Sequence, residues 1–151
     1  QTGGRWHIPR ATLPDMWQYL RELVGRETMD LKQIAEALVA GCRTGREAEN
    51  LDNLYAGEAV SVEAAVPPGM EREAHGLEAI RGKHAWWDEN FEVHGGEVEG
   101  PFLHEPDRFA VTFKMDATHK KSGERSAMHE VGLYTVQDGK IVREEFFYSM
   151  G

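Results

Sequence analysis

The chain has 151 residues, of which 40% are hydrophobic, and 17 basic against 26 acidic side chains give a net charge of −9. This length fits one domain with a core that needs no metal or disulfide, and the absence of a basic cluster argues against a nucleic-acid partner. A single cysteine, Cys42, argues against a disulfide scaffold and a cysteine-based zinc site. No apolar run approaches the roughly 20 residues that cross a bilayer, so we expect no membrane association and a cytoplasmic protein.

The first 29 residues are expected to form a helical extension of the main domain. Thr12 can cap a helix that Gly25 ends, with Pro14 in its first turn. The chain begins at Gln1, and Met29 followed by Asp30 reads like a natural start. We therefore expect residues 1–29 to be optional or non-native, and residues 30–151 to form one domain.

Two helices and a strand are expected next. Asp30 and Gln33 form a variant of the capping box that starts a helix ending within residues 41–45. Residues 47–56 predict a short second helix. Residues 58–66 alternate and are rich in valine and alanine, which predicts a strand closed by prolines.

A third helix precedes a run of strands. Leu77, Ile80, His84, Trp87 and Phe91 recur at steps of three and four, which places them on one helical face. Alternating patterns then predict strands near 92–99, 107–118, 125–137 and 140–148.

Turn signals separate the later strands, namely Lys121-Ser122-Gly123-Glu124 and Asp138-Gly139. Helices followed by antiparallel strands are typical of an α+β fold with helices on one face of a curved sheet.

Two motifs carry a family resemblance: Leu54-Tyr55-Ala56 leads into a strand, and Asp138-Gly139-Lys140-Ile141-Val142 joins the last two. Residues 30–148 resemble the SnoaL-like branch of the nuclear transport factor 2-like superfamily. The resemblance implies a cystatin-like roll, in which a cone-shaped, curved antiparallel or mixed sheet wraps around N-terminal helices and opens to an apolar ligand. The scaffold hosts ketosteroid isomerases, limonene epoxide hydrolases, polyketide cyclases, dehydratases and non-catalytic binding domains, so the fold leaves the function open.

The same landmarks imply which strand side chains point into the cone, since side chains alternate with a period of two. The inward set is Ser61, Glu63, Lys114, Asp116, Met128, Glu130, Gly132, Tyr134, Glu144, Phe146 and Tyr148, joined from the third helix by His84, Trp87 and Phe91. Several carboxylates in one partly apolar cavity raise one another's pKa values, which can create an acid and a base.

Glu63 falls where ketosteroid isomerases carry their carboxylate base, so the resemblance implies proton abstraction next to a carbonyl. The positions of that family's oxyanion-hole Asp and Tyr hold Gly132 and Leu38.

Lys114-Met115-Asp116 falls where limonene epoxide hydrolases have Arg-x-Asp, which implies that Asp116 is an acid held by Lys114. That family's second Asp is matched by Phe146, and its water-binding Tyr and Asn by Ser61 and Glu63. Epoxide hydrolysis would need Glu63 or Glu144 to replace the missing Asp.

If the assignment of residues to strand faces is shifted by one position, these side chains point toward solvent, where most glutamates lie. Lys114 and Asp116 would then be a surface pair. The histidines show no His-x-His or His-x-x-x-His spacing, so we predict neither a metal site nor a cofactor.

Val111, Phe113 and Met115 alternate with Lys114, so we expect them to form an apolar outer stripe that favours a homodimer through the sheet face.

Two hypotheses of function follow. The first is a cofactor-independent isomerase, cyclase or hydrolase acting on a small apolar carbonyl or epoxide compound. Glu63 is its base, Asp116 its acid steadied by Lys114, and Tyr134, Tyr148 and His84 orient the substrate. The second is a ligand-binding or dimerisation module without chemistry, or an engineered or fused chain on that scaffold.

Overall fold

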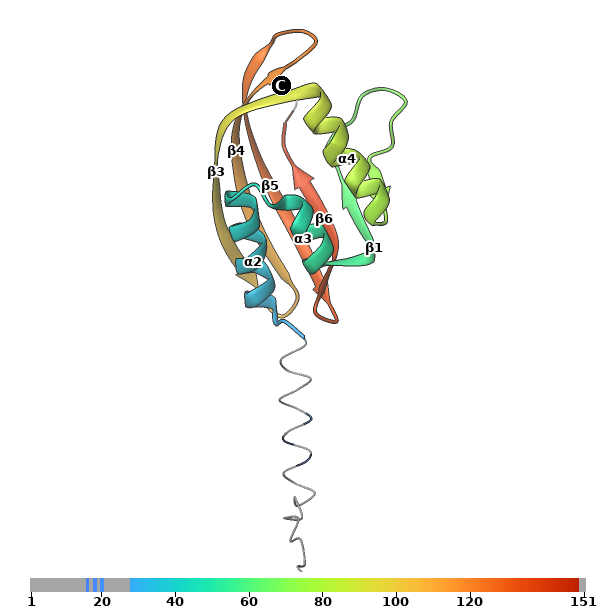
Figure 1. Cartoon of the computed structure of the whole chain (residues 1–151), viewed down its shortest axis with the longest axis vertical. Coiled ribbons are helices and arrows are strands. Elements are labelled where there is room, and N and C mark those ends of the chain that lie inside the picture. The colour runs from blue at the N-terminus through green and yellow to red at the C-terminus, as the bar shows by residue number, and fades with distance from the viewer. Residues whose placement is uncertain (1–15, 17, 19, 21–27, 150–151) are drawn as a thin grey trace, which may run out of the picture.

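The structure, a computed structural model, describes residues 16, 18, 20 and 28–149 (Figure 1). Met16, Gln18 and Leu20 are helical, and the rest of the expected N-terminal helix lies outside the described residues. No helix of the described part is long and apolar enough to span a membrane.

The first two helices of the domain begin and pack as their sequences predict. Helix α2 (Leu31–Arg43) starts with a full capping box, in which the backbone N–H of Gln33 donates to Asp30 Oδ1 at 2.8 Å. Helix α3 (Glu47–Leu54) packs beside it. The buried side chain of Asn50 on α3 donates to the carbonyl oxygen of Leu38 at 3.1 Å, which ties the two helices together.

One mixed sheet follows, and its six strands lie in the order β2-β1-β6-β5-β4-β3. Helix α4 (Leu77–Asn90) separates the first two strands from the other four. The strands are β1 (Tyr55–Val62), β2 (Glu73–His75), β3 (Phe91–His104), β4 (Arg108–His119), β5 (Arg125–Gln137) and β6 (Lys140–Phe147). Strands β1 and β6 are parallel, and all other neighbouring strands are antiparallel.

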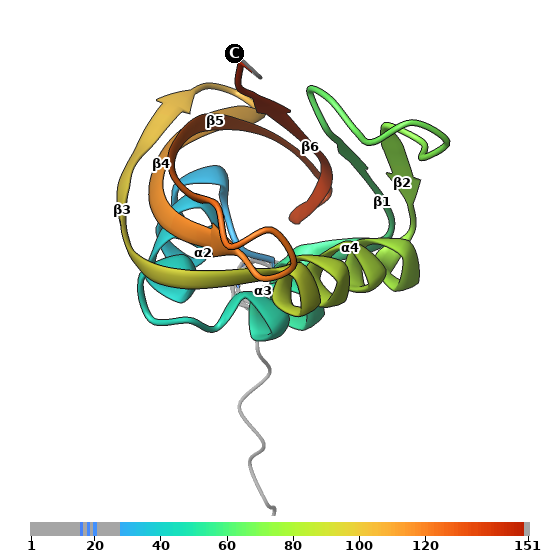
Figure 2. The same cartoon turned by 90° about the horizontal axis from the view of Figure 1, so that it is seen from above.

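The sheet curls into an open arc, and the helices lie across its concave side (Figure 2). Apolar side chains from both layers meet there. The core contains Ile34, Ala35, Leu38, Val39, Leu51, Leu54, Tyr55, Ala59, Ile80, Phe109, Val111, Tyr134, Val136 and Ile141. The α+β architecture expected from the sequence is confirmed, because the concave face of the sheet buries the apolar faces of the helices.

Some element boundaries differ from the sequence-based expectation. Helix α3 ends at Leu54, and Tyr55 opens β1 without an intervening loop. Strand β3 extends to His104 because it pairs with β4 along nearly its whole length. The short strand β2 was not expected, since three residues carry too little pattern to be seen.

The register of β4 and β5 decides which side chains share a face, because directly paired residues point to the same side of a sheet. Val111 pairs with Gly132 and is fully buried in the core. Phe113, two residues on, pairs with Glu130 and packs against that core. The expectation that Val111, Phe113 and Met115 form an outer stripe is therefore wrong, because they share the concave face.

Candidate active site

Two strand ends bring the first pair of polar side chains together. Because β1 and β6 run parallel, Glu63 just after β1 and Tyr148 just after β6 leave the sheet at the same end. The hydroxyl of Tyr148 lies 2.8 Å from Glu63 Oε2 and 2.9 Å from the carbonyl oxygen of Ala65. Partial burial, followed by the hydrogen bond to Glu63, raises the pKa of Tyr148 to about 12, so the hydroxyl remains a donor at neutral pH.

Lys83 on α4 reaches the same carboxylate from the helical layer. Its Nζ lies 2.6 Å from Glu63 Oε1 and 2.6 Å from the hydroxyl oxygen of Ser61 on β1. The side chains of Lys83 and Glu63 are 24% and 25% exposed, so this ion pair is only partly screened by water yet can still be reached from solvent. The ammonium also lies 5.5 Å from the centroid of the Phe146 ring, a distance typical of a cation–π contact.

Glu144 on β6 is the most deeply buried carboxylate of the group. It is 3% exposed, and Ser61 donates to its Oε1 at 2.7 Å while Tyr55 donates to its Oε2. Burial, together with the nearby charge of Glu144, raises the pKa of Tyr55 well above its usual value, which keeps that hydroxyl protonated. Two hydroxyl donors satisfy the carboxylate, so Glu144 serves as an internal anchor of the site.

Glu130 on β5 is a carboxyl group whose pKa is clearly raised. Burial first, and the negative charge of Glu63 second, raise its pKa from 4.5 to about 7, while Lys83 partly opposes the rise. Glu130 is half-buried and pairs across the sheet with Phe113. A glutamic acid that is partly protonated at neutral pH can donate a proton, whereas one with an ordinary pKa cannot.

An aromatic wall adjoins these polar groups. Tyr134 stacks on Phe109 with centroids 4.8 Å apart and meets Phe146 edge to face at 6.4 Å. Met128 is half-buried on the same face of β5, two residues before Glu130. The polar cluster therefore borders the aromatic core, and Phe146 and Met128 are the half-buried apolar side chains beside it.

Two of the expected site residues at the end of α4, Trp87 and Phe91, contact each other. Trp87 and Phe91 stack with centroids 4.2 Å apart, and Phe91 also meets His119 edge to face at 5.2 Å. His84 is half-buried and, among the described residues, takes no part in the hydrogen bonds around Glu63.

Lys114 and Asp116 lie on the convex face, so their expected position inside the cone is wrong. They pair with His129 and Ala127, whereas their neighbour Met115 pairs with Met128 on the concave side. Asp116 binds Arg125 through two hydrogen bonds of 2.9 and 2.6 Å, and this interaction lowers the pKa of Asp116. An exposed aspartate held by an arginine remains ionised, so it is a poor general acid.

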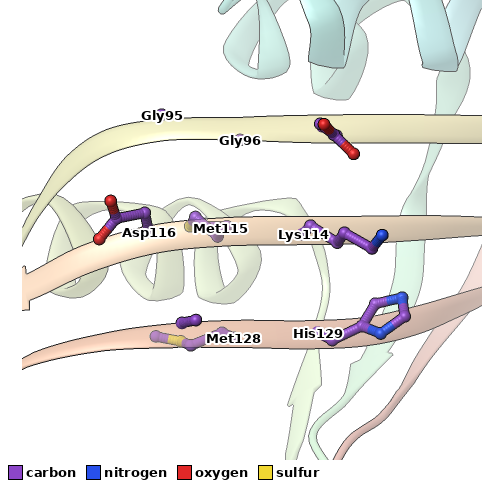
Figure 3. Close-up of a pocket in the computed structure, with 9 residues that line it drawn as sticks. Gly95, Gly96, Lys114, Met115, Asp116, Met128 and His129 are labelled. Atoms are coloured by element: carbon purple, nitrogen blue, oxygen red, sulfur yellow. The ribbon is translucent and has the colours of Figure 1, made fainter.

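Figure 3 shows these outer side chains around a shallow depression of about 560 Å³ that crosses β3, β4 and β5. Gly95 and Gly96 line it from β3 at one side, and Lys114 and His129 lie side by side on the next two strands. The sheet itself separates this depression from the Glu63 cluster, so the two cannot act on one small molecule.

Sequence reasoning missed Lys83 and the role of Tyr55. Lys83 lies three residues after the buried Ile80 and four before Trp87, so helical spacing alone places it on the inward side of α4. Tyr55 falls within the helix predicted for residues 47–56, whereas it opens β1, where an aromatic side chain is common. Among the described residues, no three His, Cys, Asp or Glu side chains are grouped to hold a metal ion.

Comparisons with known proteins agree with this architecture. A solved structure from Mesorhizobium loti, of a protein proposed to be a SnoaL-like polyketide cyclase, is 45% identical, with a TM-score of 0.74 over 80% of this chain and 100% of that one. A hypothetical protein from Catenulispora acidiphila with a ketosteroid isomerase-like fold, solved in complex with trimethylamine, is 21% identical, with a TM-score of 0.61 over 81% and 88% of the two chains. A protein from Bacillus subtilis proposed to be an isomerase is 14% identical, with a TM-score of 0.63 over 77% and 84%. These last two likenesses concern the fold alone.

No curated protein matches the chain. The sequence model of the SnoaL-like domain matches residues 29–148, which are most of the chain. That span contains every strand of the curved sheet and all the residues around Glu63. The protein therefore belongs to the SnoaL-like domain family.

Proposed function

We propose that this protein is a cofactor-independent enzyme of the isomerase or cyclase kind, acting on a small, largely apolar carbonyl compound. Glu63 is the base that removes a proton next to the carbonyl group, and Glu130 is the acid that supplies one. The observation that carries the proposal is the contrast between two neighbouring glutamates. Glu63 contacts an ammonium and a hydroxyl, whereas burial and the charge of Glu63 give Glu130 a pKa of about 7.

Further support comes from the surroundings of the pair. Phe146 and Met128 are half-buried apolar side chains, and the partial exposure of Glu63 and Lys83 leaves a route for a ligand. Polyketide cyclisation, the activity proposed for the 45% identical relative, is also a reaction of carbonyl compounds at carbon. A carbonyl substrate is favoured over an epoxide because Asp116, the expected epoxide acid, lies on the opposite face of the sheet.

Exchange of protons next to a carbonyl group tests the proposal without knowledge of the natural substrate. A panel of cyclic ketones and 1,3-diketones is incubated with the protein in D2O, and deuterium uptake is followed by NMR. We expect the wild-type protein to accelerate uptake for a subset, and Glu63→Gln to reduce that acceleration by about 10²–10⁴-fold. Asp116→Asn is the matched control and should exchange like the wild type. Unchanged exchange in Glu63→Gln would remove Glu63 as the base.

A second candidate is a binding module of the same fold that performs no chemistry. It is favoured by the fact that Glu63 and Glu144 both have hydrogen-bonding partners in the protein itself. This reading predicts tight binding of apolar ligands with no proton exchange in any member of the panel. Calorimetric titration of the same compounds, together with the exchange measurement, separates the two candidates.

We also propose that two copies of the chain associate through the convex face of the sheet. Phe102, Val131 and Phe147 are 54%, 36% and 48% exposed, and the register of their strands places all three on that face. Exposed apolar clusters of this kind mark association surfaces. Light scattering should give a dimer for the wild type and a monomer for Val131→Lys combined with Phe147→Lys. A monomeric wild type would refute this association.

A further inference from the structure

Lys83 is a cation among carboxyl groups. In the proposed reaction Glu63 is the base and Glu130 is the acid, and neither role involves Lys83. Its Nζ lies 2.6 Å from both Glu63 Oε1 and Ser61 Oγ, and its charge also acts on Glu130. An ammonium carries three N–H donors, and Glu63 and Ser61 account for two of them. One donor remains to meet a ligand that enters beside Glu63.

Proton abstraction changes the charges around this ammonium in a defined way. When Glu63 accepts a proton from carbon, the C–H bond breaks and its electron pair forms a C=C bond, while the carbonyl π pair moves onto oxygen. The carboxylate that paired with Lys83 becomes neutral, and a new negative charge appears on the substrate oxygen. A proton returned to carbon restores the carbonyl group, so nothing is oxidised or reduced overall.

We propose that Lys83 is a catalytic residue that binds the oxygen of this enolate, so that the ligands of this site are enolisable carbonyl compounds and their stable mimics, the phenols. The inference rests on the proposed function, since it assigns the oxyanion partner of the same reaction. The ammonium exchanges one anionic partner for another over a short distance, so the protein needs little rearrangement as the charge moves. The Phe146 ring, 5.5 Å below Nζ, provides an apolar floor for the ring or chain that carries the oxygen.

The alternative is a structural role, in which Lys83 only neutralises Glu63. That role predicts equal binding of charged and uncharged ligands of the same shape, because the ammonium would never leave the carboxylate. An oxyanion-binding role predicts a preference for the ionised ligand that depends on the lysine. It also predicts that removal of the Glu63 charge strengthens this preference, since the ammonium is then released from its internal partner.

The test uses 4-nitrophenol, whose ionised form is visible by absorbance, and 4-nitroanisole, which has the same shape and cannot ionise. We expect the wild type to bind the phenolate more tightly than the anisole and to lower the apparent pKa of the bound phenol. In Lys83→Met the preference should fall by about tenfold to a hundredfold, the value of a charge-assisted hydrogen bond. Anisole binding should not change, and Lys83→Arg, which keeps the charge, should retain part of the preference.

Two outcomes would overturn the assignment: a wild type that shows no preference for the phenolate, or a Lys83→Met variant that keeps the preference in full. Glu63→Gln separates this inference from the proposed function. It should bind the phenolate more tightly than the wild type while losing proton exchange. Intact exchange in Glu63→Gln would refute the proposed base. The preference for the phenolate tests the oxyanion-binding role of Lys83 independently.

Discussion

The hydroxyl of Ser61 on β1 donates a hydrogen bond of 2.7 Å to the carboxylate of Glu144 on the parallel strand β6. The same hydroxyl accepts a hydrogen bond of 2.6 Å from Lys83, which in turn pairs with Glu63. Ser61 therefore joins the buried carboxylate to the partly exposed one through a single chain of hydrogen bonds. A substitution of Glu144 should therefore alter the hydrogen bonding of Glu63, and the reverse should also hold.

Tyr55→Phe should destabilise the domain because it removes one of the two hydroxyls that satisfy the buried carboxylate of Glu144. We expect the free energy of unfolding to fall by about 1.5–3 kcal/mol, the range for a hydrogen bond to a charged group. Urea denaturation monitored by circular dichroism measures this. Tyr148→Phe is the control, since its partner Glu63 is partly exposed, and its loss should be smaller. Equal stability of Tyr55→Phe and wild type would contradict the anchoring role of Glu144.

Glu130 should make the stability of the domain fall as the pH rises from about 4.5 to about 7. Its pKa is about 7 in the folded protein against 4.5 ordinarily, so the folded state binds more protons than the unfolded state between these values. Proton binding by Glu130 is linked to folding, so the raised pKa lowers the free energy of unfolding by at most about 3 kcal/mol above pH 7 and by nothing below pH 4.5. Glu130→Gln should remove this loss and be more stable than the wild type at pH 8. Denaturant midpoints at pH 5 and pH 8 measure the difference, and parallel pH profiles of the two proteins would contradict it.

Asp116→Asn should leave ligand binding and proton exchange unchanged, because Asp116 lies on the convex face and pairs with Arg125. The pair is exposed, so its loss should shift the melting temperature little. Differential scanning fluorimetry and the exchange measurement check both statements. Loss of exchange in this variant would return Asp116 to the active site.

Gly132→Ala should disturb the aromatic wall, because a Cβ at this position would lie 2.9 Å from Tyr134 Cε2 and 3.2 Å from Phe113 Cε2. Tyr134 is 2% exposed and stacked on Phe109, so its ring cannot move freely. Overpacking of this kind costs about 1–3 kcal/mol. Chemical denaturation measures the loss, and Gly123→Ala, in an exposed turn where only the backbone conformation is strained, provides a comparison. A fully stable Gly132→Ala would show that the wall can rearrange.

Local signals in the sequence were sufficient where the structure depends on neighbouring residues. Asp30 and Gln33 predicted the start of α2, because a capping box involves only residues three apart. Asp138 and Gly139 predicted the last hairpin turn, and both have the positive φ angles, 51° and 74°, that such a turn requires.

On β4, the family landmarks implied the wrong set of inward side chains. They placed Lys114 and Asp116 inside, although the apolar residues of the strand alternate with them. An apolar face normally packs on the core of a half-buried antiparallel sheet, and here Val111 does so. A shift of one residue turns every side chain of a strand to the other face, so a small error in alignment exchanged the two sets completely.

The sequence by itself determined the α+β class, the helices and strands other than the short β2, and the inward position of Glu63, Glu130 and Glu144, because these follow from periodicity and from resemblance to a family. Only the tertiary structure decided that Lys83 joins Glu63 and that Arg125 holds Asp116 outside. The acidity of Glu130 also depends on burial and on charges from other strands. Contacts between residues far apart in the chain depend on how the layers pack and on strand register, and no local pattern encodes these distances.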